Sequence, residues 1–142
     1  MNLSALRLVL SMLAFAPARN AADLDFRWES AEAIVDATYD PHEQDVLVRI
    51  QWLESAFRRD VARCSVRGDR GRSLGSFQIQ PIGRGDGARA CGPQKEQAAL
   101  ALSYVHRSTE ACPQNNGADT LAMYVSGSCR RGLREARHRW AD

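Results

Sequence analysis

One acidic residue in this 142-residue chain lies where the surrounding pattern is apolar. Glu54 comes seven positions after Leu47 and four after Ile50, and these offsets place it beside the apolar stripe of a helix. A carboxyl group among apolar side chains loses hydration, so its protonated form is favoured. Such an acid is able to protonate a leaving group, as cleavage of a glycosidic bond requires. The alternative is an ordinary helix-end glutamate that reaches solvent or pairs with Arg58.

The helix that must position Glu54 has a strong start signal. Asp40 is suited to cap it, Pro41 occupies the first helical position, and Glu43 follows in the first turn. The apolar residues at helical spacing after this start are Val46, Leu47, Ile50, Leu53 and Phe57. We therefore expect a core helix that begins at Pro41 and passes through Glu54.

Other helices are predicted before and after a glycine-rich interruption. Ser30 is suited to cap a first helix that runs to about Thr38, after a linker over residues 19–26. A second long helix is predicted over 94–111. Shorter helices are expected at two places, over 119–124 and over 132–140.

The interruption itself contains many glycines, which allow tight turns between Arg58 and Gly92. Within it, Leu74 to Pro81 is expected to form a short strand or an extended turn. The predicted fold is mainly α: a helical bundle around a core helix, with a small glycine-rich loop and short-strand region that lines a cleft.

Composition narrows the class of protein. Apolar residues make up 44% of the chain and charged residues 25%, which is typical of one globular domain at this length. The net charge of +2 gives no strong electrostatic reason to expect nucleic-acid binding. His42, His106 and His138 are scattered without partners at helical spacing, so no metal site is predicted. We expect no cofactor and a monomeric protein.

The first 18 residues have the features of an export signal. Arg7 precedes an apolar run from Leu8 to Ala16, and Ala16-Pro17-Ala18 fits a small-x-small cleavage site. The run is too short to cross a bilayer, and no later segment is apolar enough to do so. We expect a signal peptide over 1–18, a single domain over 19–142, and a periplasmic or extracellular protein. The alternative is an N-terminal arm that stays on the protein.

The four cysteines favour the same compartment. Cys64, Cys91, Cys112 and Cys129 include no C-x-x-C pair, which excludes the usual zinc-ribbon and thioredoxin-type motifs. An even number in a small exported chain indicates two disulfides. Three pairings are possible, and we favour Cys64–Cys91 with Cys112–Cys129, because each closes a loop rich in Gly, Pro or Asn. Four free thiols in a cytosolic protein are the alternative.

Three motifs resemble those of a known superfamily. The first is Glu54-Ser55-Ala56-Phe57, and the second has two parts, Gly68-Asp69-Arg70-Gly71 and the turn Gly75-Ser76-Phe77-Gln78-Ile79. Together they resemble the lysozyme-like superfamily, closest to goose-type lysozymes and the soluble lytic transglycosylase domain. In that family a helix ends in Glu-Ser, and a Gly-Leu-Met-Gln-like turn follows. Ala122-Met123-Tyr124-Val125-Ser126-Gly127 approximates a third family element, Ala-Tyr-Asn-x-Gly, and the resemblance covers residues 45–130.

The resemblance implies an enzyme that cuts peptidoglycan glycan strands between N-acetylmuramic acid and N-acetylglucosamine. Because no segment after residue 18 is long and apolar enough, we expect no stable insertion into a membrane. The resemblance also implies that Glu54 is the catalytic acid. The backbone around Ser73 would hold the glycan near this acid, and Tyr124 would contact the sugar or position Glu54. The implied substrate-binding residues are Ser73, Gly75, Phe77, Gln78 and Tyr124.

Departures from the family pattern leave the reaction open. Gln80 stands where goose-type enzymes carry Asp, and Val125 replaces the Asn of the third motif. Asp69 is retained, either as the base that activates water or as a turn residue bonded to local backbone. Without such a base, the sugar's own 6-hydroxyl would attack and give an anhydro product. A non-catalytic glycan-binding protein with a lysozyme-like fold is the second function that we carry forward.

Five arginines gather near the end of the chain: Arg130, Arg131, Arg134, Arg137 and Arg139. We expect a solvated helix face from this cluster. Its functional alternative is attraction to an anionic wall polymer.

Overall fold

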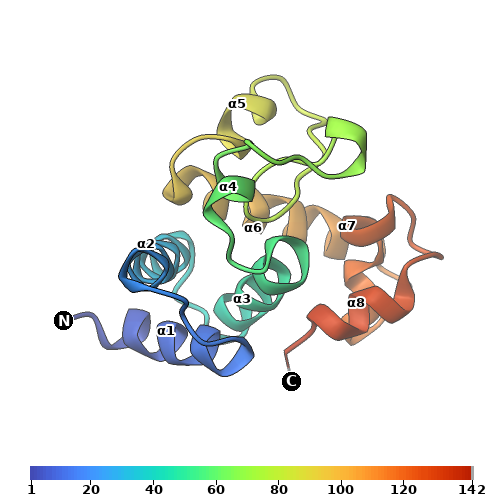
Figure 1. Ribbon diagram of the computed structural model, residues 1–142. Helices are drawn as coiled ribbons and strands as arrows, with labels where there is room; N and C mark the ends of the chain where they lie inside the picture. Colours follow the sequence, from blue (N-terminus) through green and yellow to red (C-terminus); the bar gives the residue numbers. More distant parts are fainter. Residues whose placement is uncertain (142) are drawn as a thin grey trace.

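The computed structural model describes residues 1–141 and shows a mainly helical protein, as the sequence predicts (Figure 1). Its elements are α1 (Leu3–Phe15), α2 (Ala21–Ala37), α3 (Pro41–Ser55), α4 (Arg59–Ala62), η1 (Asp69–Gly71), α5 (Asp86–Ala90), α6 (Gln94–Ala111), η2 (Gly117–Leu121), α7 (Ala122–Ser126) and α8 (Leu133–Arg139), where η marks a 3-10 helix. Over the described residues, none of these helices has the length and apolar character that a membrane span requires.

The central helix α3 starts as predicted. The side chain of Asp40 accepts a hydrogen bond from the His42 amide, and Pro41 is the first helical residue. The helix ends at Ser55, because Ala56 adopts a left-handed conformation with φ 51°. The expectation that Leu53 belongs to the core is wrong, since it is 42% exposed. Glu54 thus lies in the last turn of a helix whose other face is buried.

The helix α2 is longer than predicted, and the expected linker over 19–26 is wrong. It begins at Ala21, where the side chain of Asn20 accepts from the Asp23 amide at 2.8 Å. Asp23 and Arg27 are both buried and form an ion pair at 3.4 Å on this helix. Two charged residues on the buried face conceal the apolar periodicity from which a helix is normally predicted.

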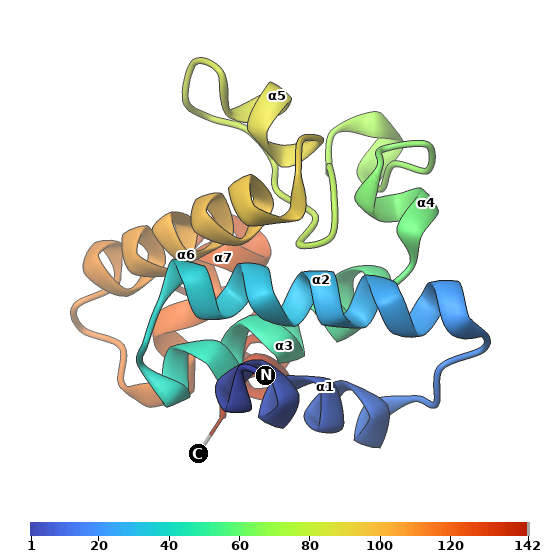
Figure 2. The ribbon, with the colours of Figure 1, turned by 90° about the vertical axis from the view of Figure 1, so that its left-hand side faces the viewer.

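The N-terminal helix α1 packs against α2 and α3 (Figure 2). Its inner face is fully buried and consists of Ala5, Leu8, Val9 and Met12. The guanidinium of Arg27 donates to the carbonyl of Met12 at 3.0 Å, which also accepts from the Ala16 amide, and to the carbonyl of Ala16 at 2.6 Å, just past the end of α1. Arg7 pairs with Asp45 of α3 at 2.6 Å. Removal of residues 1–18 as a signal peptide stays a prediction.

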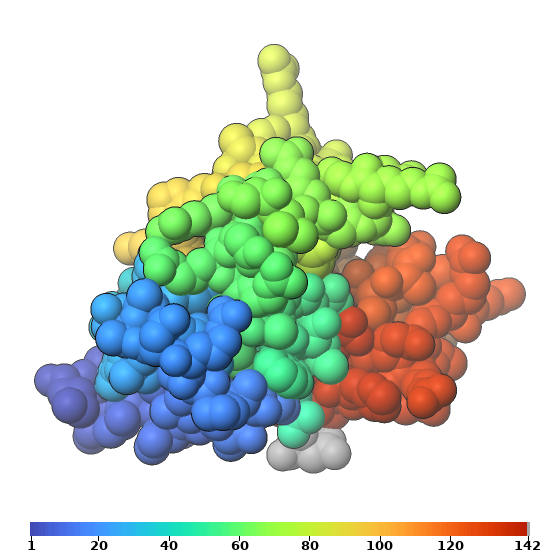
Figure 3. All heavy atoms as spheres, viewed as in Figure 1, coloured from blue at the N-terminus to red at the C-terminus, as the bar shows by residue number. Residues whose placement is uncertain are grey.

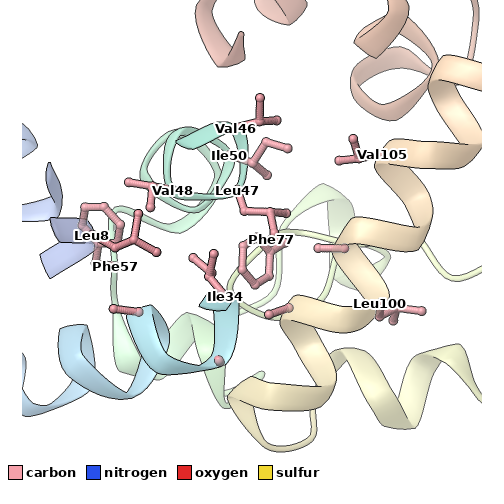
Figure 4. Packing of buried hydrophobic residues seen from close by; sticks show 14 of the residues in the cluster. Leu8, Ile34, Val46, Leu47, Val48, Ile50, Phe57, Phe77, Leu100 and Val105 are labelled. Carbon is pink, nitrogen blue, oxygen red and sulfur yellow. The ribbon is translucent and has the colours of Figure 1, made fainter. Parts of the chain in front are cut away.

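The hydrophobic core lies where α1, α2, α3 and α6 meet (Figure 4). Leu8, Ile34 and Leu47 come from the first three helices, and Leu100 comes from α6. Phe77 enters the same core from the glycine-rich region. The core therefore joins the helices to the loop segment that follows Glu54.

The helix α6 spans the residues predicted for it, 94–111. Its buried amide side chains hold the glycine-rich region against the helix. The amide nitrogen of Gln97 donates to the carbonyls of Ala62 and Gly92, both at 2.8 Å. Its oxygen accepts from the Ser76 backbone amide at 2.8 Å. The predicted strand near Leu74 is a single bridge between Leu74 and Ile79 that closes the turn. These bonds fix the path of the chain below the cleft.

Both favoured disulfides are confirmed. Cys64 is bonded to Cys91 across 27 residues, and Cys112 to Cys129 across 17 residues. The first ties the start of the glycine-rich region to its end, and the second ties the end of α6 to the segment before α8. Two disulfides are compatible with an exported protein.

Candidate functional site

A cleft of about 720 Å³ opens between the end of α3, the glycine-rich region, α6 and α7. Figure 3 shows its two sides, the green part of the chain above and the red part below. Five residues predicted for the site line this cleft: Glu54, Asp69, Ser73, Gln78 and Tyr124. The structure thus brings together side chains from three separate motifs of the sequence.

Two further predicted residues lie outside the cleft lining. The ring of Phe77 is 2% exposed and packs in the core, so it supports the turn from below instead of facing a ligand. Gly75 has φ +77°, and a Cβ there would lie 2.0 Å from the Ala90 carbonyl oxygen. Only glycine fits this close approach between the turn and α5.

The carboxyl group of Glu54 is bound by an arginine from the far end of the chain. Its Oε1 accepts from Arg139 Nε at 3.1 Å and from Nη2 at 2.5 Å, and the Glu54 side chain is 20% exposed. These two bonds fix the position of Oε1. The alternative partner Arg58 pairs instead with Asp60 at 2.6 Å.

The expectation of a solvated helix face is wrong for Arg139, one of the five clustered arginines. It is buried, and its Nη1 donates to the carbonyl of Glu135 one turn earlier in α8 at 2.7 Å. Arg139 follows the buried Ala136 by three positions, so both lie on the inner face of α8. That spacing was the only sequence signal for the contact.

Tyr124 is held beside Glu54. Its hydroxyl donates to the Phe77 carbonyl at 2.8 Å, and its backbone amide donates to Ser108 Oγ at 3.1 Å. Burial raises the pKa of Tyr124 well above its usual value, and the nearby charge of Glu54 raises it further. The phenol therefore stays neutral at physiological pH and ties α7 to the turn that carries Gln78.

The Gly68 and Gln78 motifs contact each other directly. Gln78 has φ 49° and its side-chain amide donates to the Gly75 carbonyl at 2.9 Å. A Cβ at Gly68 would lie 2.2 Å from Gln78 Oε1, so a side chain at that position would displace the glutamine. This packing explains why a glycine and a glutamine ten residues apart belong to one site.

Asp69 is exposed at the cleft and has φ 53°. Its carboxylate accepts a hydrogen bond from the amide of Gln80, which also donates to Ser73 Oγ at 3.3 Å. Gln80, the departure from the family pattern, is therefore the group that positions Asp69. The carboxylate of Asp69 is thus bonded to another side chain and not to local backbone.

Other cleft residues had no sequence signal. Tyr104 donates its hydroxyl to Asp86 at 2.7 Å and accepts from the Ile82 amide at 3.0 Å. Arg72 and Arg107 are exposed at the cleft and bring positive charge to it. Within residues 1–141, no group of three His, Cys, Asp or Glu side chains is placed to hold a metal ion.

No protein-family model, curated protein or solved structure matches this chain.

Proposed function

We propose that the protein cleaves peptidoglycan glycan strands at the β-1,4 bond between N-acetylmuramic acid and N-acetylglucosamine, with Glu54 as the general acid. The observation that carries this proposal is a single half-buried carboxyl group at the end of a rigid helix that opens into a 720 Å³ cleft. The cleft also holds the Gln78 turn and Tyr124. Cleavage of a glycosidic bond needs a carboxylic acid at the wall of the cleft that holds the glycan.

The hydrogen bonds to Glu54 within residues 1–141 all go to Oε1, which leaves Oε2 for a ligand. In the proposed reaction the proton on Oε2 moves to the glycosidic oxygen as the bond from that oxygen to the anomeric carbon breaks. The leaving sugar takes this proton with the bonding electron pair. Glu54 is then a carboxylate. The attacking hydroxyl group forms the new bond to the anomeric carbon and gives its proton either to Glu54 or to a second carboxylate.

The attacking group decides between two products of the same acid. Water activated by Asp69 would give a reducing end, as in hydrolysis with a second carboxylate. The 6-hydroxyl of the sugar would give a 1,6-anhydro end and would need Glu54 alone. Asp69 lines the same cleft as Glu54, so its replacement by Asn separates the two: hydrolysis would fall, whereas anhydro formation would persist.

A non-catalytic glycan-binding protein is the second candidate. The observation that favours it is the ion pair with Arg139, because a carboxylate held in an ion pair binds sugar hydroxyls but has no proton to donate. Under this alternative the protein would bind insoluble peptidoglycan without shortening its strands.

The test is the clearing of a peptidoglycan suspension over a range of pH by the wild type, Glu54→Gln and Glu32→Gln. Glu32 is an exposed residue of α2, so its variant removes one negative charge away from the cleft. We expect Glu54→Gln to lose clearing by about 100-fold or more and Glu32→Gln to retain it. Equal clearing by all three proteins, or binding with no clearing by any, would reject the enzymatic proposal.

A further inference from the structure

Arg139 and Glu54 are 85 residues apart in sequence and form a contact that joins α8 to the end of α3. Two nitrogens of the guanidinium converge on Oε1, and the third donates to the Glu135 carbonyl. The side chain of Arg139 is 10% exposed. Because the guanidinium is anchored on both sides and shielded from solvent, it fixes the position of Oε1.

The other charged and titratable groups that line the cleft with this carboxyl come from three elements and the residue after one of them. They are Tyr124 of α7, Tyr104 and Arg107 of α6, Asp69 of η1, and Arg72 just after η1. Tyr124 is neutral, and Asp69 is bonded to Gln80. Arg139 is the charged group of the described chain that is in direct contact with Glu54. It is therefore the charged group that fixes this carboxyl in place.

We infer that Arg139 is a positioning residue that holds Oε1 of Glu54 and leaves only Oε2 for the glycan, so that the proton used in cleavage is carried on Oε2. The inference rests on the proposed function. The proton comes from solvent, binds Oε2, and then passes to the glycosidic oxygen. Arg139 opposes the first transfer and favours the second, because it stabilises the carboxylate that the second transfer produces.

The direct test follows the carbon-13 resonance of the Glu54 carboxyl through a pH titration, with the resonance assigned by its loss in Glu54→Gln. We expect the midpoint to rise by about one pH unit or more in Arg139→Gln, because the ionised form loses its partner. Arg139→Lys keeps the charge and should return the midpoint toward that of the wild type.

Arg137→Gln is the matched control. It removes the same charge from the same helix, but Arg137 pairs with Asp119 at 2.9 Å and its side chain is 60% exposed. We expect its Glu54 midpoint to equal that of the wild type. An equal midpoint in Arg139→Gln, or an equal shift in Arg137→Gln, would overturn the inference.

A second measurement uses the wild type alone and so does not depend on the folding of a variant. The Nε–H resonance of Arg139 should change with pH at the same midpoint as the Glu54 carboxyl, because the two groups share a hydrogen bond. An Arg139 resonance that does not respond while Glu54 titrates would overturn the inference.

The clearing of a peptidoglycan suspension links this inference to the reaction. It also distinguishes a failure of the inference from a failure of the proposed function. Cleavage needs protonated Glu54, so the pH at which clearing falls by half on the alkaline side should rise in Arg139→Gln. Clearing by the wild type with an unchanged alkaline limb in Arg139→Gln would overturn the inference and leave the proposed function standing. No clearing by any variant, with the midpoint shift present, would overturn the proposed function and support the Arg139 contact.

Discussion

Two regions of the molecule are stabilised in different ways. The helical region, made of α1, α2, α3 and α6, encloses a continuous apolar core. The loop region, made of residues 63–92 and 112–132, has short helices and depends on both disulfides and on the buried amide of Gln97. The difference indicates that the helical region supplies rigidity and that the loop region supplies the shape of the cleft.

The candidate site lies on the boundary between these regions. Glu54 belongs to the helical region, whereas Asp69 and Gln78 belong to the loop region. Tyr124 connects the two, because its hydroxyl donates to the Phe77 carbonyl of the loop region and its backbone amide donates to Ser108 of α6. Arg139 of α8 bonds to the Glu54 carboxyl of the helical region. Changes that destabilise either region should therefore alter the site, but their costs in unfolding free energy should differ.

The largest expected effect comes from removing residues 1–18, which tests whether α1 belongs to the helical region. Loss of Leu8, Val9 and Met12 should cost about 5 kcal/mol or more of unfolding free energy. That is comparable with the whole stability of many domains, so we expect the shortened chain not to unfold cooperatively on heating.

The control for this truncation is Leu10→Gln in the full chain, because Leu10 is on the exposed face of α1. It should melt within a few degrees of the wild type. A shortened chain that melts as the full chain does would contradict the role of α1 in the core and would favour its removal as a signal peptide. Sequencing the N-terminus of the exported protein would then decide.

The next effect concerns the cross-links of the loop region. Replacing Cys64 and Cys91 together by Ser should lower the unfolding free energy by about 3 kcal/mol, because the 27-residue loop gains freedom when unfolded. Hydrogen exchange should show that protection falls first over 63–92 and persists in α3 and α6. Equal loss of protection in both regions would contradict the distinction between them.

A smaller effect is expected at Gly75, where two segments of the loop region pack against each other. Gly75→Ala would place a Cβ against the Ala90 carbonyl. Gly71 also has a positive φ, of +87°, but a Cβ added there would have no heavy atom within 4 Å. An alanine at either position carries the left-handed backbone penalty of about 1 kcal/mol. The clash should make Gly75→Ala less stable than Gly71→Ala by about 2 kcal/mol in chemical denaturation. Equal stabilities would show that the turn relaxes freely.

The smallest effect is a polar contact of the helical region. Partial burial raises the pKa of Glu43, but hydrogen bonds from Thr38 and His106 outweigh it and hold the pKa below its usual value of 4.5. The folded state thus gains stability above about pH 4.5 and loses it as the pH falls further. Thr38→Val removes the 2.6 Å bond and should cost about 1 kcal/mol at pH 6. The cost should be smaller at pH 3, and an equal cost at both would contradict this reading.

Much of the fold followed from local patterns. Helix α3 was predicted because Asp40 and Pro41 are a strong start signal, and α6 because its apolar spacing is regular. The first half of α2 was missed, since Asp23 and Arg27 neutralise each other only in the folded protein. A pattern of residue types contains no information on such pairs before the fold is known.

The candidate site was predicted less completely. Short motifs identified Glu54, Asp69 and Gln78, because each motif is local in sequence. Arg139 was missed as a partner of Glu54, since the contact joins residues 85 positions apart. Phe77 was expected at the ligand, but its ring fills the core while its carbonyl holds Tyr124. Long-range contacts and the direction of a side chain depend on tertiary structure.

The most direct test of the central claim is the mass of the fragments released from purified peptidoglycan by the wild type and by Glu54→Gln. If Glu54 is the acid, the wild type releases fragments with new reducing or 1,6-anhydro ends, and Glu54→Gln, folded and with both disulfides formed, releases none. The same fragments from Glu54→Gln, or no fragments from the folded wild type at any pH, would contradict the account.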